Sequence, residues 1–242
     1  MNGTKSIALY AKELKLPTFV DYQTVIRQAT ENGWGYEEFL WQMLAREAAK
    51  RRENQIARLI KRARFPLKKT LDEFKFEHLP YLEEALVSQL ATGSFIEKRE
   101  NIVMIGNPGT GKTHLSIALG LAGCYRGYSA RFFTAAELVT KLTEARDEHR
   151  MGRLTREIAK TNLLIVDELS YVSFPRHSAE LLFQVISERS ERGSVIINTN
   201  LDFSKWDQIF SDHMLAAALV DRVTFKSHIL NMNGDSYRLK HR

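Results

Sequence analysis

The segment 106-GNPGTGKT-113 decides the fold of this chain of 242 residues. The short apolar run 101–105 precedes it and a helical pattern over 113–123 follows it, so a strand leads into the turn and a helix leaves it. Its four fixed positions match G-x-x-x-x-G-K-[ST] completely. Glycines let backbone N–H groups approach an anion closely, and a helix N-terminus favours negative charge. The sequence therefore predicts a cradle for the phosphates of a nucleotide, rather than a glycine-rich turn that holds none.

Each residue of this cradle has an expected role. Lys112 should reach the β- and γ-phosphates as a catalytic residue, and the hydroxyl of Thr113 should be a ligand of Mg²⁺. The expected cofactors are ATP and Mg²⁺. The residues expected to contact the nucleotide are Gly106, Asn107, Pro108, Gly109, Thr110, Gly111, Lys112, Thr113 and His114.

An acidic pair closes the apolar segment 163-LLIVDE-168. An apolar strand would deliver Asp167 and Glu168 to its C-terminal end, the edge at which open sheets bind ligands. We expect Asp167 to hold Mg²⁺ through water and Glu168 to polarise the water that attacks the γ-phosphate. The alternative is that the pair only forms a turn.

Two further residues are candidates for catalysis. Asn200 ends the apolar run 194-SVIINTN-200, where its amide could orient water near the γ-phosphate. The alternative is a turn asparagine. Arg222 follows a helical pattern and could reach a nucleotide bound by a neighbouring subunit, as an arginine finger does. Its alternative is an ion pair with Asp221 or another acid of the same chain.

The region after residue 80 alternates strands and helices. Strands are expected over 101–105, 130–134, 162–166 and 194–199, with one charged helix over 135–160 and another over 178–189. Such an alternation predicts a parallel sheet with right-handed crossovers. The Asn233-Gly234 pair predicts a closing hairpin over 232–238, with Arg238 on its surface.

The first third of the chain has a helical pattern. Short helices within 1–35 should be broken at Leu16-Pro17 and at 33–35, and a long helix over 36–64 should end before Pro66. A linker follows over 67–80. We expect the aromatic residues Trp34, Tyr36 and Trp41 to pack in a core rather than stack on bases.

Net charge is concentrated in this first third. The chain has a formal net charge of +6, and residues 1–75 account for all of it; residues 46–69 hold ten basic and two acidic side chains. Like charges at helical spacing repel, so an external anion is expected to neutralise them. Duplex DNA is the favoured partner; the alternatives are an acidic partner protein and a solvated face. The residues expected to contact DNA are Arg51, Arg52, Arg58, Lys61, Arg62, Arg64, Arg146, Arg150 and Arg153. For the last three, ion pairs with the nearby acids Glu144, Asp147, Glu148 and Glu157 are the alternative, and the sequence slightly favours it.

Composition excludes several classes of protein. One cysteine, Cys124, excludes a disulfide framework, and a hydrophobic content of 44% excludes a wholly disordered chain. The sequence contains no apolar run of the roughly 18–20 residues needed to span a bilayer and no secretion signal near Met1. We expect a cytoplasmic protein without a membrane partner.

The ordered motifs resemble those of IstB-like transposition helper ATPases, within the DnaC helicase-loader branch of AAA+ ATPases. The resemblance rests on 106-GNPGTGKTHL-115, 163-LLIVDEL-169, 199-TNL-201 and 234-GDSYR-238, and on the early 14-LKLP-17. It implies a P-loop NTPase of AAA+ type: an α/β fold with a parallel five-stranded sheet between helices, preceded by a small all-helical N-terminal domain. The expected domains are 1–67 for DNA binding, partner binding and self-assembly, and 68–242 for ATP hydrolysis.

The resemblance also implies a function. It assigns ATP contact to the phosphate loop, Mg²⁺ to Asp167, catalysis to Glu168 and sensing to Asn200. It implies a homo-oligomer on duplex DNA that recruits a partner transposase (IstA-like) and selects the target site, largely without sequence preference. The usual AAA+ helical lid with its cis arginine is not evident, which favours a site completed by assembly.

Three other functions remain open on the sequence. A helicase loader acting on a replicative helicase would share these motifs. A DNA-binding module gated by nucleotide, with incidental hydrolysis, would also share them. A small-molecule kinase would share the phosphate loop alone.

Overall fold

The computed structural model describes residues 3–171, 175–210 and 212–237. The chain folds as two compact units, Met1–Arg58 and Leu59–Arg242. The sequence pattern had set the boundary nine residues later, after residue 67. Residues 59–67 belong to the larger unit because Leu59, Ile60 and Phe65 pack against its core.

The first unit is helical. Its elements are α1 (Gly3–Glu13), a 3₁₀ turn (Pro17–Asp21), α2 (Tyr22–Asn32) and the start of α3 (Tyr36–Ala63). The breaks occur where the sequence predicted them: Pro17 opens the 3₁₀ turn, and Gly33 ends α2 with a φ of 65°, which favours glycine. The long helix matches its predicted range to within one residue.

Few apolar residues of this unit are buried. Among its described side chains, the buried apolar ones are Ala11, Val25 and Met43. The prediction that the aromatic residues near the basic helix form a core is wrong for two of the three: Tyr36 is 96% exposed and Trp41 is 60% exposed, while Trp34 is half-buried.

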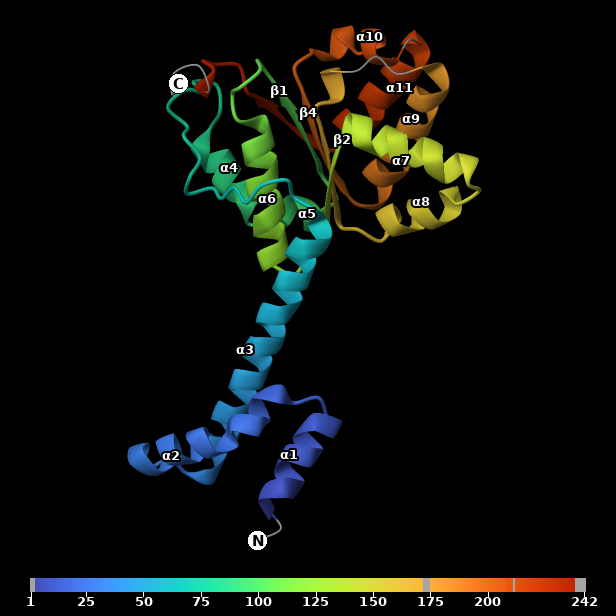
Figure 1. Cartoon of the computed structure of the whole chain (residues 1–242). Coiled ribbons are helices and arrows are strands. Elements are labelled where there is room, and N and C mark those ends of the chain that lie inside the picture. Colours follow the sequence, from blue (N-terminus) through green and yellow to red (C-terminus); the bar gives the residue numbers. More distant parts are fainter. Residues whose placement is uncertain (1–2, 172–174, 211, 238–242) are drawn as a thin grey trace. The chain divides into compact units, whose positions relative to one another are not determined.

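The larger unit is built around one parallel sheet (Figure 1). Its strand order is β2-β3-β4-β1-β5, and each pair is parallel. The strands are β1 (Asn101–Ile105), β2 (Ala130–Thr134), β3 (Leu163–Asp167), β4 (Ser194–Thr199) and β5 (Ser227–Asn231). Every residue of β1, β3 and β4 is buried, as expected for strands covered on both faces.

Helices cover both faces of this sheet (Figure 1). One face packs against α4 (Glu84–Ala91), α5 (Ser94–Glu97) and α6 (Lys112–Tyr125). The other packs against α7 (Ala135–Asp147), α8 (Met151–Ala159), α9 (Arg176–Arg192), α10 (Asp207–Phe210) and α11 (His213–Thr224). Successive strand residues point to opposite faces, so Val103 joins the second core while Ile102 and Met104 join the first.

Two predictions about elements are wrong. The single helix over 135–160 is broken: His149 adopts a φ of 55°, and α7 and α8 are separate helices on either side of it. The closing hairpin is absent from the described residues 232–237: the last strand is β5, which ends at Asn231 and pairs parallel to β1, with His228 opposite Ile102. Arg238 lies outside the described residues.

Among the helices of the described residues, none combines the length and the apolar character needed to cross a membrane.

Candidate active site

The phosphate loop joins the C-terminal end of β1 to the start of α6. Gly109 and Gly111 adopt φ values of 81° and 94°, which residues with a Cβ rarely adopt. Gly111 precedes the first turn of α6, and no side chain within the described ranges caps that turn by a hydrogen bond. The backbone N–H groups of this turn therefore point toward the space where the sequence predicts phosphates.

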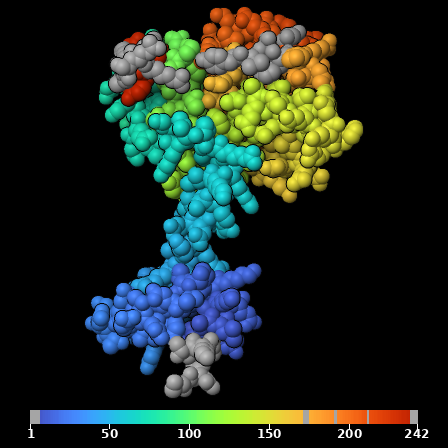
Figure 2. Space-filling view, viewed as in Figure 1, coloured from blue at the N-terminus to red at the C-terminus, as the bar shows by residue number. Residues whose placement is uncertain are grey.

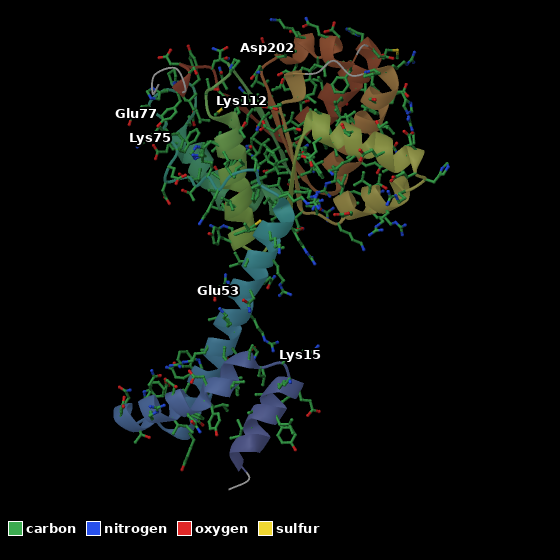
Figure 3. The ribbon with its side chains drawn as sticks, in the orientation of Figure 1. Lys15, Glu53, Lys75, Glu77, Lys112 and Asp202 are labelled. Carbon is green, nitrogen blue, oxygen red and sulfur yellow. The ribbon has the colours of Figure 1, made fainter. Side chains whose placement is uncertain are left out.

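The side chain of Lys112 closes the loop on itself. Its Nζ donates to the carbonyl oxygens of Gly106 and Asn107, each at 2.7 Å. Thr110 Oγ1 also donates to Asn107 O, at 2.8 Å. Lys112 is only 8% exposed and lies where α6 meets the edge of the sheet (Figure 3). The ammonium group is thus already held beside the anion cradle.

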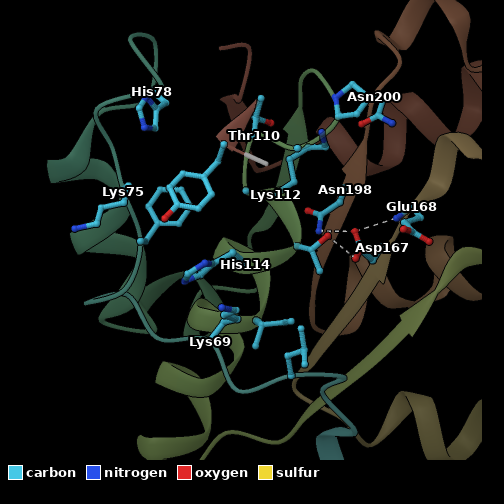
Figure 4. Close-up of a pocket in the computed structure, with 18 of the residues that line it drawn as sticks. Lys69, Lys75, His78, Thr110, Lys112, His114, Asp167, Glu168, Asn198 and Asn200 are labelled. Carbon is cyan, nitrogen blue, oxygen red and sulfur yellow. Dashed lines mark hydrogen bonds between the residues drawn. The ribbon is translucent and has the colours of Figure 1, made fainter. Parts of the chain in front are cut away.

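Asp167 and the phosphate loop meet directly, although 54 residues separate Thr113 from Asp167. Asp167 ends β3 and is 3% exposed, and Thr113 Oγ1 donates to its Oδ2 at 2.8 Å (Figure 4). Glu168 follows with a φ of 58°, and its backbone N–H donates to Asp167 Oδ1 at 3.0 Å. The Glu168 side chain is exposed and lines the same cavity.

Asn198 is a site residue that the sequence analysis missed. Its Nδ2 donates to Asp167 Oδ1 at 2.9 Å and to Ser116 Oγ at 3.0 Å. Asn198 is 1% exposed, and its Oδ1 accepts no hydrogen bond from any described residue. Asn200 also lines the cavity, but its hydrogen bond is backbone N–H to Ser170 Oγ, at 2.9 Å. The available signal was an asparagine that directly follows the apolar run 195–197 inside a buried strand.

The segment 67–78, which we call the strap, forms one wall of the site. Phe74 lies so close to the phosphate loop that a Cβ on Gly111 would be 2.9 Å from its ring. His114 Nε2 lies 2.8 Å from the carbonyl oxygen of Thr70, and the rings of His114 and Phe74 meet edge to face at 5.3 Å. His114, expected to contact nucleotide, therefore links α6 to the strap and also lines the cavity.

The segment 232–237, which we call the C-terminal segment, also lines the cavity, through Asp235 and Tyr237. Met232 N donates to Ile105 O at 2.6 Å, and Tyr237 N donates to Gly109 O at 3.1 Å. A Cβ on Gly106 would lie 2.3 Å from the backbone of Met232. Because a hairpin was expected here, the sequence analysis missed Asp235 and Tyr237 as lining residues.

These elements enclose a cavity of about 370 Å³. It has phosphate-loop N–H groups and Lys112 at one side, acidic groups at β3, and the aromatic and basic side chains of the strap (Figure 4). This volume lies within the range of small-molecule sites. Such an arrangement can hold a polyphosphate, a divalent cation and an aromatic base together.

The remaining predicted residues lie outside this cavity. The guanidinium of Arg222 lies over the ring of Phe183, 5.4 Å from its centroid, so it does not line its own chain's site. Arg51 donates to Glu47 Oε1 and to Lys15 O, each at 2.7 Å, which gives it a structural contact in the first unit. Arg52 and Arg58 are exposed in that unit. The exposed residues Lys61, Arg62, Arg64, Arg150 and Arg153, and the half-buried Arg146, belong to the larger unit.

Comparisons with known proteins agree with this picture. The family model described as "IstB-like ATP binding protein" matches residues 9–242. The ATP-binding protein of insertion sequence IS5376 from Geobacillus stearothermophilus is 38% identical over 232 residues, 96% of this chain and 92% of that protein. The ATP-binding protein of IS21 from Pseudomonas aeruginosa is 36% identical over 218 residues, 90% of this chain and 82% of that protein.

Solved structures share the fold. The crystal structure of DnaI matches with a TM-score of 0.56 and 16% identity, over 70% of this chain and 90% of that chain. AMPPCP-bound DnaA from Aquifex aeolicus matches with a TM-score of 0.57 and 19% identity, over 73% of this chain and 54% of that one. The predicted fold class, a P-loop AAA+ sheet preceded by helices, is confirmed.

Proposed function

This chain belongs to the family of IstB-like ATP binding proteins, and on that premise we propose that it is a Mg²⁺-dependent ATPase that assembles on duplex DNA and recruits a transposase. In this proposal it acts in insertion-sequence transposition, where the transposase uses it to select a target site. The observation that carries the ATPase is the direct contact of Thr113 with Asp167, which joins the phosphate loop to the acidic strand end.

The cavity supports ATP as the nucleotide. The loop carbonyls that accept from Lys112 can be exchanged for β- and γ-phosphate oxygens, because the ammonium is already beside them. At the other side of the cavity, Phe74, His78 and Tyr237 supply aromatic surface for a purine. The strap lysines Lys69 and Lys75 add positive charge to the same wall.

The donor set fits Mg²⁺. Asp167 and Thr113 present a carboxylate and a hydroxyl oxygen 2.8 Å apart, and Mg²⁺ prefers oxygen ligands from one or two protein groups together with phosphates and water. Among the described residues, no group of three or more acidic, histidine or cysteine side chains is arranged so that it could hold a metal ion by itself, so the proposed site relies on the phosphates and water for the remaining ligands. When bound, the ion would neutralise charge on the β- and γ-phosphates.

Hydrolysis then requires a positioned water. Glu168 lies beside Asp167 with an exposed carboxylate, so it can accept a proton from a water aligned with the γ-phosphate. Asn200 is available to orient that water. Asn198 holds Asp167 in place through its amide.

The position of Arg222 supports a shared site. No arginine is present among the described residues that line the cavity, while Arg222 lies over Phe183, away from it. An arginine from a neighbouring subunit would supply the missing positive charge at the γ-phosphate. Assembly into a homo-oligomer is further supported by the first unit, which exposes ten of the 17 large apolar side chains exposed among the described residues.

Duplex DNA as partner is supported by the basic residues of 46–69, which outnumber the acidic ones ten to two. The relatives named as insertion-sequence proteins favour a transposase over a replicative helicase as the protein partner. Pull-down of the ATP-bound chain with each candidate distinguishes the two.

The ATPase is tested with two variants. Lys112→Ala should lose nucleotide binding, whereas Glu168→Gln should bind ATP but hydrolyse it roughly 10²–10⁴-fold more slowly, as expected when a general base is removed. The Glu168→Gln variant should also accumulate on duplex DNA in ATP, seen by electron microscopy.

The matched control is Glu97→Gln, an exposed carboxylate on α5 that does not line the cavity. It should hydrolyse ATP at the wild-type rate. Wild-type turnover by Glu168→Gln would reject the catalytic assignment. Equal affinity for DNA with ATP, with ADP and without nucleotide would instead favour a binding module with incidental hydrolysis.

A further inference from the structure

A second cleft of about 340 Å³ lies away from the nucleotide cavity, in the larger unit. Four arginines line it: Arg64, Arg131, Arg150 and Arg153. They come from three separate places, namely the end of α3, strand β2 and the region of α8. Figure 2 shows the surface of the first residues of this unit (cyan) next to that of α7 and α8 (yellow).

Backbone geometry brings these arginines together. Arg64 has a φ of 57° and follows the last residue of α3, while His149 has a φ of 55° and separates α7 from α8. Without the break at His149, a continuous helix would carry Arg150 and Arg153 onward along the axis of α7. Arg131 is fixed between these two parts, since its Nη1 donates to Arg62 O at 2.9 Å.

The cleft holds more positive than negative charge. Lys141 joins the four arginines, against three glutamates, Glu144, Glu148 and Glu157. Arg131 pairs with Glu157 at 3.4 Å and Arg150 pairs with Glu148.

Within the described residues, Arg64 and Arg153 form no ion pair. Burial lowers the pKa of Arg131, and the positive charge of Arg64 lowers it further, while the carboxylates of Glu157 and Glu137 raise it by less. The two guanidinium groups therefore repel each other, and a bound anion would relieve that repulsion.

We propose that this cleft binds a phosphate of a nucleic-acid backbone through Arg64 and Arg153, with Arg131 behind them. The planar fork of a guanidinium matches two phosphate oxygens, and a phosphodiester can accept from several forks at once. The exposed Lys61 and Arg62 precede Arg64 and extend the basic surface, which suits a polymer with repeating phosphates. This inference rests on the proposed binding of duplex DNA.

The test compares two charge reversals on one helix. Arg153→Glu changes the cleft, whereas Arg156→Glu makes the same change of charge on α8 at an exposed residue outside the cleft. Binding of the full chain to a labelled duplex is measured by fluorescence anisotropy across salt concentrations, with circular dichroism and thermal unfolding as checks of folding.

Arg153→Glu should weaken binding roughly tenfold near 0.1 M salt and reduce the slope of log affinity against log salt by about 0.9, the value of one lost phosphate contact. Arg156→Glu should change the affinity and the slope far less. The double variant Arg64→Gln with Arg153→Gln should lose less affinity for the duplex than the product of the fold-losses of the two single variants, because both residues contact the same phosphate.

The outcomes separate the two proposals. A wild-type chain that binds no duplex DNA would reject DNA binding as part of the proposed function. A wild type that binds, with equal losses for Arg153→Glu and Arg156→Glu, would reject the cleft alone. Unchanged binding by both variants would also reject it and would favour an acidic protein segment as the occupant.

Discussion

At the scale of single residues, the Asp167 carboxylate is held from two sides. Oδ2 accepts from the Thr113 hydroxyl, and Oδ1 accepts from the Asn198 amide and from the N–H of Glu168. Groups behind a metal-binding carboxylate orient it and tune its affinity for the metal. Asn198 is therefore a positioning residue for the proposed Mg²⁺ site, while Asn200 lines the cavity, where we propose that it orients water.

This difference predicts separate phenotypes for the two asparagines. Asn198→Ala should raise the Mg²⁺ concentration needed for half-maximal ATP turnover about tenfold, because a hydrogen bond to a charged group contributes roughly 1.5–3 kcal/mol. Asn200→Ala should lower the maximal rate without changing that concentration. Titrations of turnover with Mg²⁺ measure both; an unchanged Mg²⁺ requirement in Asn198→Ala contradicts the positioning role.

Sequence reasoning found the loop residues but selected Asn200 rather than Asn198. The loop is local: eight consecutive residues with fixed glycines define their own backbone geometry. The strand itself was predicted with its observed bounds, 194–199. Those bounds do not tell which asparagine meets Asp167, because that contact spans 31 residues of sequence.

At the scale of elements, the C-terminal segment and the strap both line the nucleotide cavity, and they contact each other. A Cβ on Gly234 would lie 2.1 Å from the carbonyl oxygen of His78. The rings of His78 and Tyr237 are 5.9 Å apart. The glycine that predicted a hairpin turn is thus needed for a close approach of two backbones.

Gly234→Ala should therefore destabilise the larger unit and weaken ATP binding. The new methyl group forces the strap and the C-terminal segment apart, at a cost of about 1–3 kcal/mol, typical of overpacking. Gly152→Ala is the matched control, since no atom lies within 4 Å of its added Cβ and α8 should gain up to about 1 kcal/mol. Thermal unfolding and titration with a fluorescent ATP analogue measure both effects; equal behaviour of the two variants would contradict the close approach.

The elements that sequence reasoning missed are those set by non-local contacts. The break at His149 involves neither proline nor glycine, so no local signal marks it. Strand β5 has an irregular mixture of polar and apolar residues, and its place is decided by pairing with β1 more than a hundred residues earlier. The strands β1, β3 and β4 were predictable because their apolar runs are long enough to be buried on both faces.

At the scale of the whole molecule, the two units differ in how they are stabilised. The larger unit has an apolar core on each face of its sheet. The first unit depends on a buried acid: Glu47 is 4% exposed and accepts from Thr18 N, from Thr18 Oγ1 at 2.6 Å and from Arg51. Burial raises the pKa of Glu47, but these hydrogen bonds and the charge of Arg51 lower it by more, so its pKa lies below the ordinary value.

The first unit should consequently lose stability in acid. A carboxyl whose pKa is lower in the folded state stabilises above its unfolded pKa, about 4.3, and that stabilisation is lost as the pH falls through the folded pKa. Glu47→Gln should destabilise the unit by about 1–3 kcal/mol at pH 7 and remove this part of its pH dependence.

The measurement is hydrogen exchange of amides in residues 17–50 of the full chain between pH 7 and pH 3, corrected for intrinsic rates. Glu53→Gln serves as the control, because Glu53 lies exposed on α3 and, within the described part of the chain, its one ion-pair partner is the exposed Lys50 (Figure 3). It should change protection by less than about 0.5 kcal/mol. Equal effects of the two substitutions would contradict the role of Glu47.

The strand order also has a consequence for biosynthesis. Strand β1 lies between β4 and β5, so its neighbours are translated long after it. At roughly 5–20 residues per second, a ribosome needs about 6–25 seconds to add the residues between β1 and the end of β5. The buried, mainly apolar β1 lacks both partners until β4 has been made and one partner until β5 has been made, and we expect the nascent chain to need chaperones at this stage.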